Sequence, residues 1–141
     1  MTTPSDAIAK PFPPEDPVTA PFWAAVREHR LVAPACRSCG LVFLYPRVTC
    51  PRCLGREFDW PELSGRGHVY SCTVIRQAMD PAFVADVPYV FAIVQLDEGP
   101  RMASNVVGCP PESVTPDQAV EVVFDDIGEG NVVPRFRPVG T

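Results

Sequence analysis

Positive charge is scarce in this chain. Lys10 is its single lysine, and with the arginines it brings the basic total to 12 against 17 acidic residues, a formal net charge of −5. A negative chain repels the phosphate backbone whose attraction supplies most non-specific nucleic-acid affinity. Nucleic acid is therefore not the partner that the composition predicts.

Long apolar runs are absent as well. No stretch approaches the roughly 18 apolar residues of a membrane helix, and the N-terminus lacks the basic region and apolar core of a signal peptide. We therefore expect no membrane span, no signal peptide and a cytoplasmic location. In a reducing compartment, closely spaced cysteines are more often metal ligands than disulfides.

Residue types for acid-base or nucleophilic catalysis are few. The two histidines are His29 and His68, and the two cysteines outside the close pairs are Cys72, within a β-type run, and Cys109, before two prolines. Free cysteine usually packs as a small hydrophobe, and the acidic turn 125–129 fits neither a paired-carboxylate nor a calcium template. We therefore predict no catalytic residue in this chain.

The strongest signal is a pair of cysteine knuckles. Cys36 and Cys39 form one C-x₂-C pair, and Cys50 and Cys53 form the second. Two such pairs bring four thiolates to one tetrahedral Zn²⁺ at about 2.3 Å and leave no coordination position open for a substrate. The spacing predicts a structural zinc site, which stabilises the fold and does not catalyse.

The chain divides into three predicted regions. Residues 1–32 form a proline-rich arm followed by a helix, which we expect to begin at Thr19 as N-cap and to run to Arg30. Residues 33–62 form the zinc ribbon, in which 41–47 is expected to be a β-hairpin arm and Phe58 and Trp60 a short strand. So small a module needs its metal to fold.

Residues 63–141 read as short strands separated by turns. The strands are expected at 68–75, 88–96, 101–107, 120–124 and 132–136, with a turn-rich crossing at 108–116. The run 88–96 is apolar on both faces, which predicts a strand covered on both sides. Five short strands suit a small closed barrel of the OB type, so the fold class is mainly β.

Several motifs in this order resemble a known family. They are Pro21-Phe22-Trp23, the four cysteines, Ser64-Gly65-Arg66-Gly67, Val87-Pro88-Tyr89-Val90, Leu96-Asp97-Glu98-Gly99-Pro100-Arg101, and Pro134-Arg135-Phe136-Arg137. In these motifs, over about residues 21–138, the chain resembles the zinc-ribbon/OB-fold family once catalogued as domain of unknown function 35. That family is associated with acyl-CoA metabolism.

The resemblance implies a non-catalytic accessory subunit in a hetero-oligomer. The partner would be a thiolase-fold enzyme: a thiolase, an aldolase that shortens sterol side chains in steroid degradation, or an acyltransferase; some relatives accompany a hydratase. It also implies one structural Zn²⁺, and acyl-CoA bound together with the partner. The acyl substrate, the stoichiometry and the partner's class stay open.

Two groups of residues are candidates for contact with a partner or CoA. Phe22 and Trp23 on the helix and Phe83 in the loop 77–88 can pack within the chain or against a partner. The terminal motif places Phe136 between Arg135 and Arg137, and the family resemblance motivates their contact with CoA or a partner.

Two other functions remain open. A single-stranded nucleic-acid or general interaction module is one, because OB barrels and zinc ribbons serve it elsewhere, although Tyr70, Tyr89 and Phe91 are expected in the core. A stand-alone acyl-CoA-binding protein is the other. The ribbon arginines 37, 47, 52 and 56 are expected to be a solvated or protein-contacting surface, with CoA phosphates and an acidic partner as the other interpretations.

Overall fold

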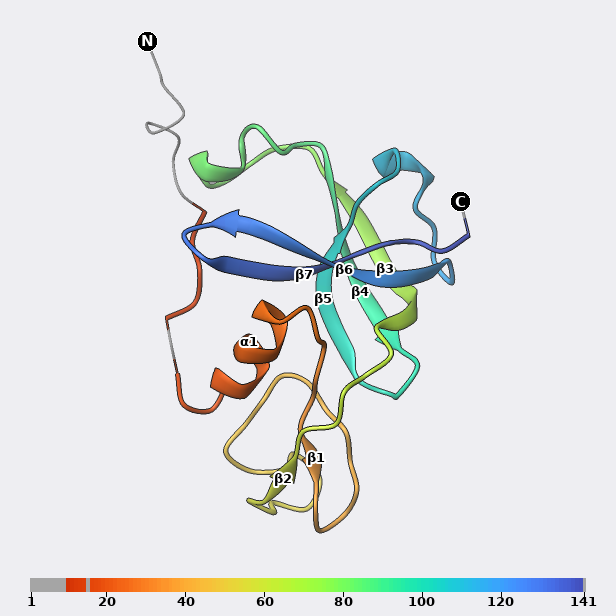
Figure 1. Cartoon of the computed structure of the whole chain (residues 1–141). Helices are drawn as coiled ribbons and strands as arrows, with labels where there is room; N and C mark the ends of the chain where they lie inside the picture. Colours follow the sequence, from red (N-terminus) through yellow and green to blue (C-terminus); the bar gives the residue numbers. More distant parts are fainter. Residues whose placement is uncertain (1–9, 15, 141) are drawn as a thin grey trace.

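Within the described residues, the fold consists of one α-helix, a small ribbon and a barrel. The computed structural model describes residues 10–14 and 16–140, so the first nine residues of the predicted arm lie outside the described residues. The helix α1 (Ala20–Arg27) lies between a ribbon formed by β1 (Ala35–Cys36) and β2 (Phe58–Asp59) and the barrel (Figure 1). No helix in the described part is long and apolar enough to cross a membrane. The predicted mainly β architecture is confirmed.

The barrel closes through five strands in the order β3-β4-β5-β7-β6, and β6 returns to β3. All neighbours are antiparallel except β5 and β7, which run parallel through the Val106–Phe136 pair. Closure leaves no long exposed edge for unwanted strand pairing. The strands are β3 (Arg66–Ile75), β4 (Tyr89–Leu96), β5 (Arg101–Val106), β6 (Ala119–Gly128) and β7 (Asn131–Pro138).

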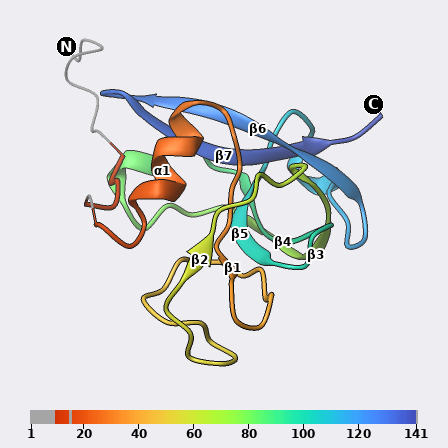
Figure 2. The same cartoon turned by 60° about the horizontal axis from the view of Figure 1, so that its bottom comes forward.

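Inward-facing apolar side chains from all five strands fill the barrel and continue to α1. Phe136 is completely buried, and so are Val69, Val94 and Val120. Phe22 and Val26 of α1 belong to the same cluster. Leu31 and Ala33, which lead from the helix into the ribbon, belong to it as well, so helix, barrel and the start of the ribbon share one core. Figure 2 shows α1 beside β7 of the barrel.

The helix ends at Arg27, three residues before the predicted end at Arg30. His29 adopts a left-handed backbone (φ 60°), and its amide and that of Arg30 donate to the Val26 and Ala25 carbonyls at 2.9 Å each. This is a Schellman-type end, which satisfies the last helix carbonyls and reverses the chain. The His29 ring stacks on Phe124 of β6 at 5.2 Å, which fixes the helix end on the barrel.

The last two strands are longer than predicted. The acidic residues that we expected in a loop continue β6 to Gly128, with Asp125 paired to Val133 and Asp126 to Val132. Only Glu129 and Gly130 form the turn, both with positive φ. Cross-strand pairing therefore outweighs the low strand propensity of aspartate here.

The prediction that 88–96 is covered on both faces is wrong. Along β4, Val90, Ala92, Val94 and Leu96 are buried, whereas Phe91 between them is 42% exposed. Tyr70 on β3 is also exposed, and the Arg101 guanidinium lies 3.9 Å from its ring centre. Tyr70 and Phe91, which we expected in the core, thus lie on the outer face of the barrel.

The expected hairpin at 41–47 is wrong as well. Residues 41–43 pair instead with the segment before the first knuckle: the Cys36 amide donates to the Leu41 carbonyl at 2.8 Å, and the Phe43 amide to the Pro34 carbonyl at 3.1 Å. This pairing wraps the chain around the first knuckle. The predicted strand after the second knuckle is present as β2, although it ends at Asp59, before Trp60.

Two short helical turns complete the barrel connections. The turn η2 (Pro81–Phe83) lies in the 77–88 loop, where the Asp80 side chain accepts from the Ala82 amide. The turn η3 (Pro111–Ser113) lies between β5 and β6, in the crossing that was expected to be rich in turns. Met79 in the first of these loops is 94% exposed.

Gly67 is the position where the barrel has no room for a side chain. A Cβ there would overlap the Gln95 carbonyl and lie 3.0 Å from Leu96 Cα, on the neighbouring strand. Gly67→Ala should therefore push β3 from β4 and lower the free energy of unfolding by about 1–3 kcal/mol. Urea denaturation measures this, and Ser71→Ala, at an exposed position of the same strand, should change it by less than about 0.5 kcal/mol. An unchanged Gly67→Ala midpoint would contradict this packing.

Candidate metal centre and contact residues

The four knuckle cysteines converge on one point in the ribbon. Their sulfur atoms all lie within 4.8 Å of one another, with 3.5 Å between Cys36 and Cys53 and 3.6 Å between Cys39 and Cys50. Four sulfurs on a tetrahedral Zn²⁺ at 2.3 Å are separated by about 3.8 Å. The donor set and its spacing therefore fit a metal ion of this kind.

The surroundings of the cluster also suit a metal–thiolate site. A Cβ on Gly55 would stand 3.2 Å from Cys36 Sγ and 3.3 Å from Cys53 Sγ, so the bare backbone lets the chain pass close to the sulfurs. The Arg52 amide donates to Cys50 Sγ at 3.4 Å, and its guanidinium donates to the Cys39 carbonyl at 2.9 Å. These donors stabilise thiolate charge. No role for Gly55 or Arg52 at the metal cluster was predicted from the sequence, although both lie in or beside the second knuckle.

The surroundings lower the pKa of one cluster thiol and raise the pKa of another. The backbone amide of Leu41, assisted by Arg52, lowers the pKa of Cys39 to about 6. At Cys53 the Gly55 amide lowers the pKa, but hydrogen bonds to Cys36 and Cys39 outweigh it and raise the pKa to about 12. Metal binding at neutral pH therefore displaces the Cys53 proton, and acid opposes metal binding.

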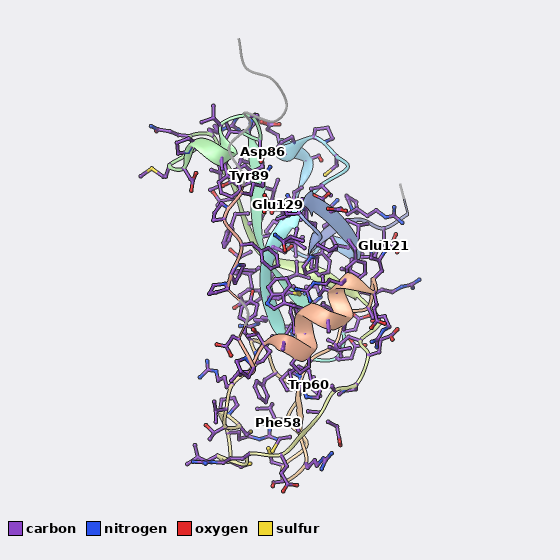
Figure 3. All side chains as sticks on the ribbon, turned by 60° about the vertical axis from the view of Figure 1, so that its left-hand side comes forward. Phe58, Trp60, Asp86, Tyr89, Glu121 and Glu129 are labelled. Carbon is purple, nitrogen blue, oxygen red and sulfur yellow. The ribbon has the colours of Figure 1, made fainter. Side chains whose placement is uncertain are left out.

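One tyrosine connects the ribbon to the barrel. The Ala103 amide of β5 donates a hydrogen bond to the Tyr45 hydroxyl at 2.8 Å, and that hydroxyl donates one to the Ala103 carbonyl at 3.3 Å. Phe43, two residues earlier, is buried and meets Phe58 edge-on at 5.6 Å (Phe58 labelled in Figure 3). The segment after the first knuckle thus touches the ribbon core with one ring and the barrel with the next.

Removing the Tyr45 hydroxyl should loosen this connection. Tyr45→Phe leaves the Ala103 amide without its partner, and we expect a loss of about 1 kcal/mol in the free energy of unfolding. Guanidinium denaturation followed by tryptophan fluorescence measures this. Tyr89→Phe is the matched control, because within the described residues the Tyr89 hydroxyl makes no hydrogen bond. Equal midpoints for Tyr45→Phe and the wild type would contradict the expected role of the hydroxyl.

The six predicted contact residues do not form one site. Trp23 is half-buried and packs on Phe12 at 4.8 Å, while Phe83 is half-buried beside Tyr89 at 6.4 Å. Phe22 and Phe136 are 3% and 0% exposed, because both fill the core, so their predicted contact with CoA or a partner is corrected to packing within the chain.

The two arginines of the terminal motif differ in exposure, with 20% of the Arg135 side chain and 57% of the Arg137 side chain accessible to solvent. Arg135 Nε lies 2.9 Å from an Asp125 oxygen, and its guanidinium donates to the Asn105 amide oxygen at 3.3 Å. Arg137 is more exposed and donates to Glu121 at 3.0 Å (Glu121 labelled in Figure 3). Each arginine already has an acidic neighbour within the chain, which partly neutralises its charge.

Three surface pockets are lined in part by the predicted contact residues. One of about 460 Å³ is lined by Arg137, Glu121 and Gly108. A mainly apolar one of about 370 Å³ lies between the arm, α1 and Tyr45, and one of about 320 Å³ includes Arg135, Tyr89 and Cys109. Neither histidine lines any of the three.

Comparison with known proteins gives two domain matches. Residues 23–59 match the model of the ChsH2 rubredoxin-like zinc ribbon domain, and residues 60–125 match the ChsH2 C-terminal OB-fold domain. In the solved structures, the chain is similar to one in the "Ltp2-ChsH2(DUF35) aldolase". The TM-score is 0.82 with 32% identity, over 90% of this chain and 98% of that chain.

Curated relatives have several names. A DUF35 domain-containing scaffold protein of Methanocaldococcus jannaschii is 35% identical over 88% of this chain and 93% of its own length. A probable enoyl-CoA hydratase alpha subunit of Thermomonospora curvata is 35% identical over 83% of this chain but only 36% of its own length. The benzoylsuccinyl-CoA thiolase subunit BbsA of Thauera aromatica is 34% identical over 53% of this chain and 50% of its own length. The chain belongs to the DUF35 family, with a rubredoxin-like zinc ribbon followed by an OB-fold domain.

Proposed function

We propose that this chain is a non-catalytic accessory subunit of a thiolase-fold enzyme that acts on acyl-CoA thioesters. The observation that carries the proposal is the likeness to a chain of the ChsH2(DUF35) aldolase, which spans 98% of that chain. Relatives named as a scaffold protein and as a thiolase subunit support the same role. Because one relative is named as a hydratase subunit, a hydratase is the alternative class of partner enzyme.

The exposed apolar side chains support a partner-binding role. Tyr70 and Phe91 lie on the outer face of the barrel at 51% and 42% exposure, and Met79 and Val84 lie in the 77–88 loop at 94% and 62%. Exposed apolar side chains of this kind, on strands and in a loop between them, are common at protein interfaces. In the complex this chain would stabilise the enzyme and help to shape the entrance for acyl-CoA.

The chemistry would then divide between the two subunits. In this chain Zn²⁺ at the four cysteines would hold the ribbon, and it would have no free position for substrate. Carbon–carbon bond cleavage, thiolysis or acyl transfer would take place on residues of the partner. Trp23, Phe83, Arg135 and Arg137 keep surface for contact with the partner or CoA, and the reducing cytoplasm would keep the zinc thiolates reduced.

Co-purification tests this function. The tagged full-length chain, expressed in its native host, should retain a thiolase-fold polypeptide at fixed stoichiometry through size-exclusion chromatography, and the complex should process an acyl-CoA substrate. Recovery of a hydratase instead would change the partner class. A chain that stays alone and binds CoA by itself would replace the proposal with the stand-alone carrier.

The second candidate function is binding of single-stranded nucleic acid. Exposed Tyr70 and Phe91 lie on neighbouring strands of an OB barrel, where aromatic side chains stack bases in other proteins. The charge of −5 and the Arg101 guanidinium already over Tyr70 oppose it. Tight binding of a thymidine oligonucleotide at 150 mM salt by the wild-type chain, lost in Phe91→Ala, would favour this candidate.

A further inference from the structure

The two cysteine knuckles make the same turn but end in different residues. Gly40 follows Cys39 with φ 79°, and Leu54 follows Cys53 with φ 66°. The equivalent amides donate to the first cysteine of each knuckle, Gly40 to Cys36 at 2.8 Å and Leu54 to Cys50 at 3.0 Å. Glycine adopts this left-handed backbone freely, whereas a leucine Cβ is crowded there. The second knuckle therefore holds a side chain where the turn favours none.

The Leu54 side chain gains little packing within its own chain. It is 72% exposed. Three other non-glycine residues in the described part have positive φ: His29 stacks on Phe124, and Asp117 and Glu129 are polar. Leu54 alone among these four exposes an apolar side chain from a strained backbone. Such positions are characteristic of sites where the residue serves a function.

The neighbours of Leu54 form a small apolar and basic surface. The Cys50 amide donates to the Gly55 carbonyl at 2.7 Å, so the residues just before Cys50 approach the knuckle where Leu54 and Gly55 lie. Val48 is 61% exposed, and one exposed arginine lies on each side of the second knuckle, Arg47 before it and Arg56 after it. We call Arg47, Val48, Leu54 and Arg56 the knuckle tip.

The charge of the knuckle tip is opposite to that of the rest of the molecule. All 17 acidic residues lie outside the stretch 29–56. Arg37 pairs with Glu57 and Asp59, but Arg47 and Arg56 form no ion pair within the described residues. A zinc–tetrathiolate centre would carry two negative charges, which balance Arg47 and Arg56, so the exposed Arg52 of the second knuckle leaves one net positive charge at this end of the ribbon. A surface that matches the tip is therefore apolar at its centre and acidic at its rim.

We propose that the knuckle tip is a docking site for the enzyme subunit of the complex, and this inference rests on the proposed function. Leu54 and Val48 enter an apolar depression, and Arg47 and Arg56 face carboxylates around it. A folded protein suits the tip better than nucleic acid, because its apolar side chains are aliphatic and cannot stack bases as aromatic rings do. Docking here also covers Cys53, the exposed ligand of the metal cluster.

Leu54→Gly tests the proposal, because it relieves the backbone while removing the contact. The probe is the thiolase-fold subunit that co-purifies with the wild-type chain, and its affinity is measured by isothermal titration calorimetry. We expect binding at least about tenfold weaker. Zinc content and melting temperature should be unchanged or higher. Leu54→Met, which keeps an apolar side chain at the same backbone, should stay within about threefold of the wild type.

The salt dependence of association tests the role of Arg47 and Arg56. Wild-type association should slow as salt rises, and the double variant Arg47→Ser/Arg56→Ser should reduce that dependence. If the wild type forms the complex and Leu54→Gly binds equally well, the docking site is wrong and the proposed function stands. If the wild type forms no complex with the subunit, both fall.

Two further results would overturn the docking site in favour of another occupant. Light scattering that shows a dimer of the wild-type chain, abolished by Leu54→Gly, would assign the tip to a second copy. Binding of a thymidine oligonucleotide that requires Arg47 and Arg56 would assign it to nucleic acid.

Discussion

A Cys36→Ser chain is expected to lose its Zn²⁺ and, with it, the folded ribbon. Cys36 is 3% exposed, and its sulfur lies 3.5 Å from Cys53 Sγ in the four-sulfur cluster. Structural Zn²⁺ contributes roughly 10–16 kcal/mol of apparent binding energy in small modules, and serine is a poor replacement for a thiolate. Bound zinc, measured by mass spectrometry of the metal after gel filtration, should fall from about one per chain to a small fraction.

The ribbon's own contacts cannot replace the metal. Its two strands have two residues each, and the aromatic contact inside it is the Phe43–Phe58 pair. We expect protease cleavage within 37–57 in Cys36→Ser, while the barrel keeps its β-sheet circular dichroism. Cys72→Ser and Cys109→Ser are matched controls, because neither cysteine belongs to the cluster, and both should keep zinc. A Cys36→Ser chain without zinc and with a protected ribbon would contradict the structural role.

Elements set by short-range chemistry were predictable from the sequence. The four ligands follow from their spacing, and the five strands from β-branched runs between glycine and proline turns. The resemblance to the family supplied the order of the parts. What was missed depends on backbone pairing between strands, which the residue types alone do not specify: β6 extends through two aspartates because β7 pairs with them. Likewise, residues 41–43 pair with 34–36 around the first knuckle.

The predictions from the sequence also assigned some residues wrongly to the core or to the surface. An apolar run such as 88–96 does not reveal whether its second face is covered by the same chain or left for a partner, and Phe91 proved exposed. Conversely, the terminal motif flanks Phe136 with arginines and suggested a contact, but strand alternation turns the phenyl ring inward and the guanidiniums outward. The helix end at Arg27 was missed because the left-handed residue after it is His29 and not glycine, and non-glycine residues with positive φ are uncommon.

The second large effect is expected at Phe136. Its side chain is completely buried, it pairs with Val106 where β5 and β7 meet, and its carbonyl accepts from the Val107 amide at 2.7 Å. Phe136→Ala leaves a cavity at the point that closes the barrel, and we expect a loss of about 3–5 kcal/mol in the free energy of unfolding. Differential scanning calorimetry should show a melting temperature lower by about 10 °C or more.

Arg137→Ala is the matched control, one position along the same strand. Its guanidinium is exposed and, among the residues that the structure describes, forms an ion pair with Glu121, so the loss of stability should stay below about 1 kcal/mol. If the motif acts through its arginines, Arg137→Ala weakens binding to the enzyme subunit at unchanged stability, whereas Phe136→Ala lowers stability first. A Phe136→Ala chain with wild-type melting temperature and impaired partner binding would return Phe136 to the contact role that its burial now opposes.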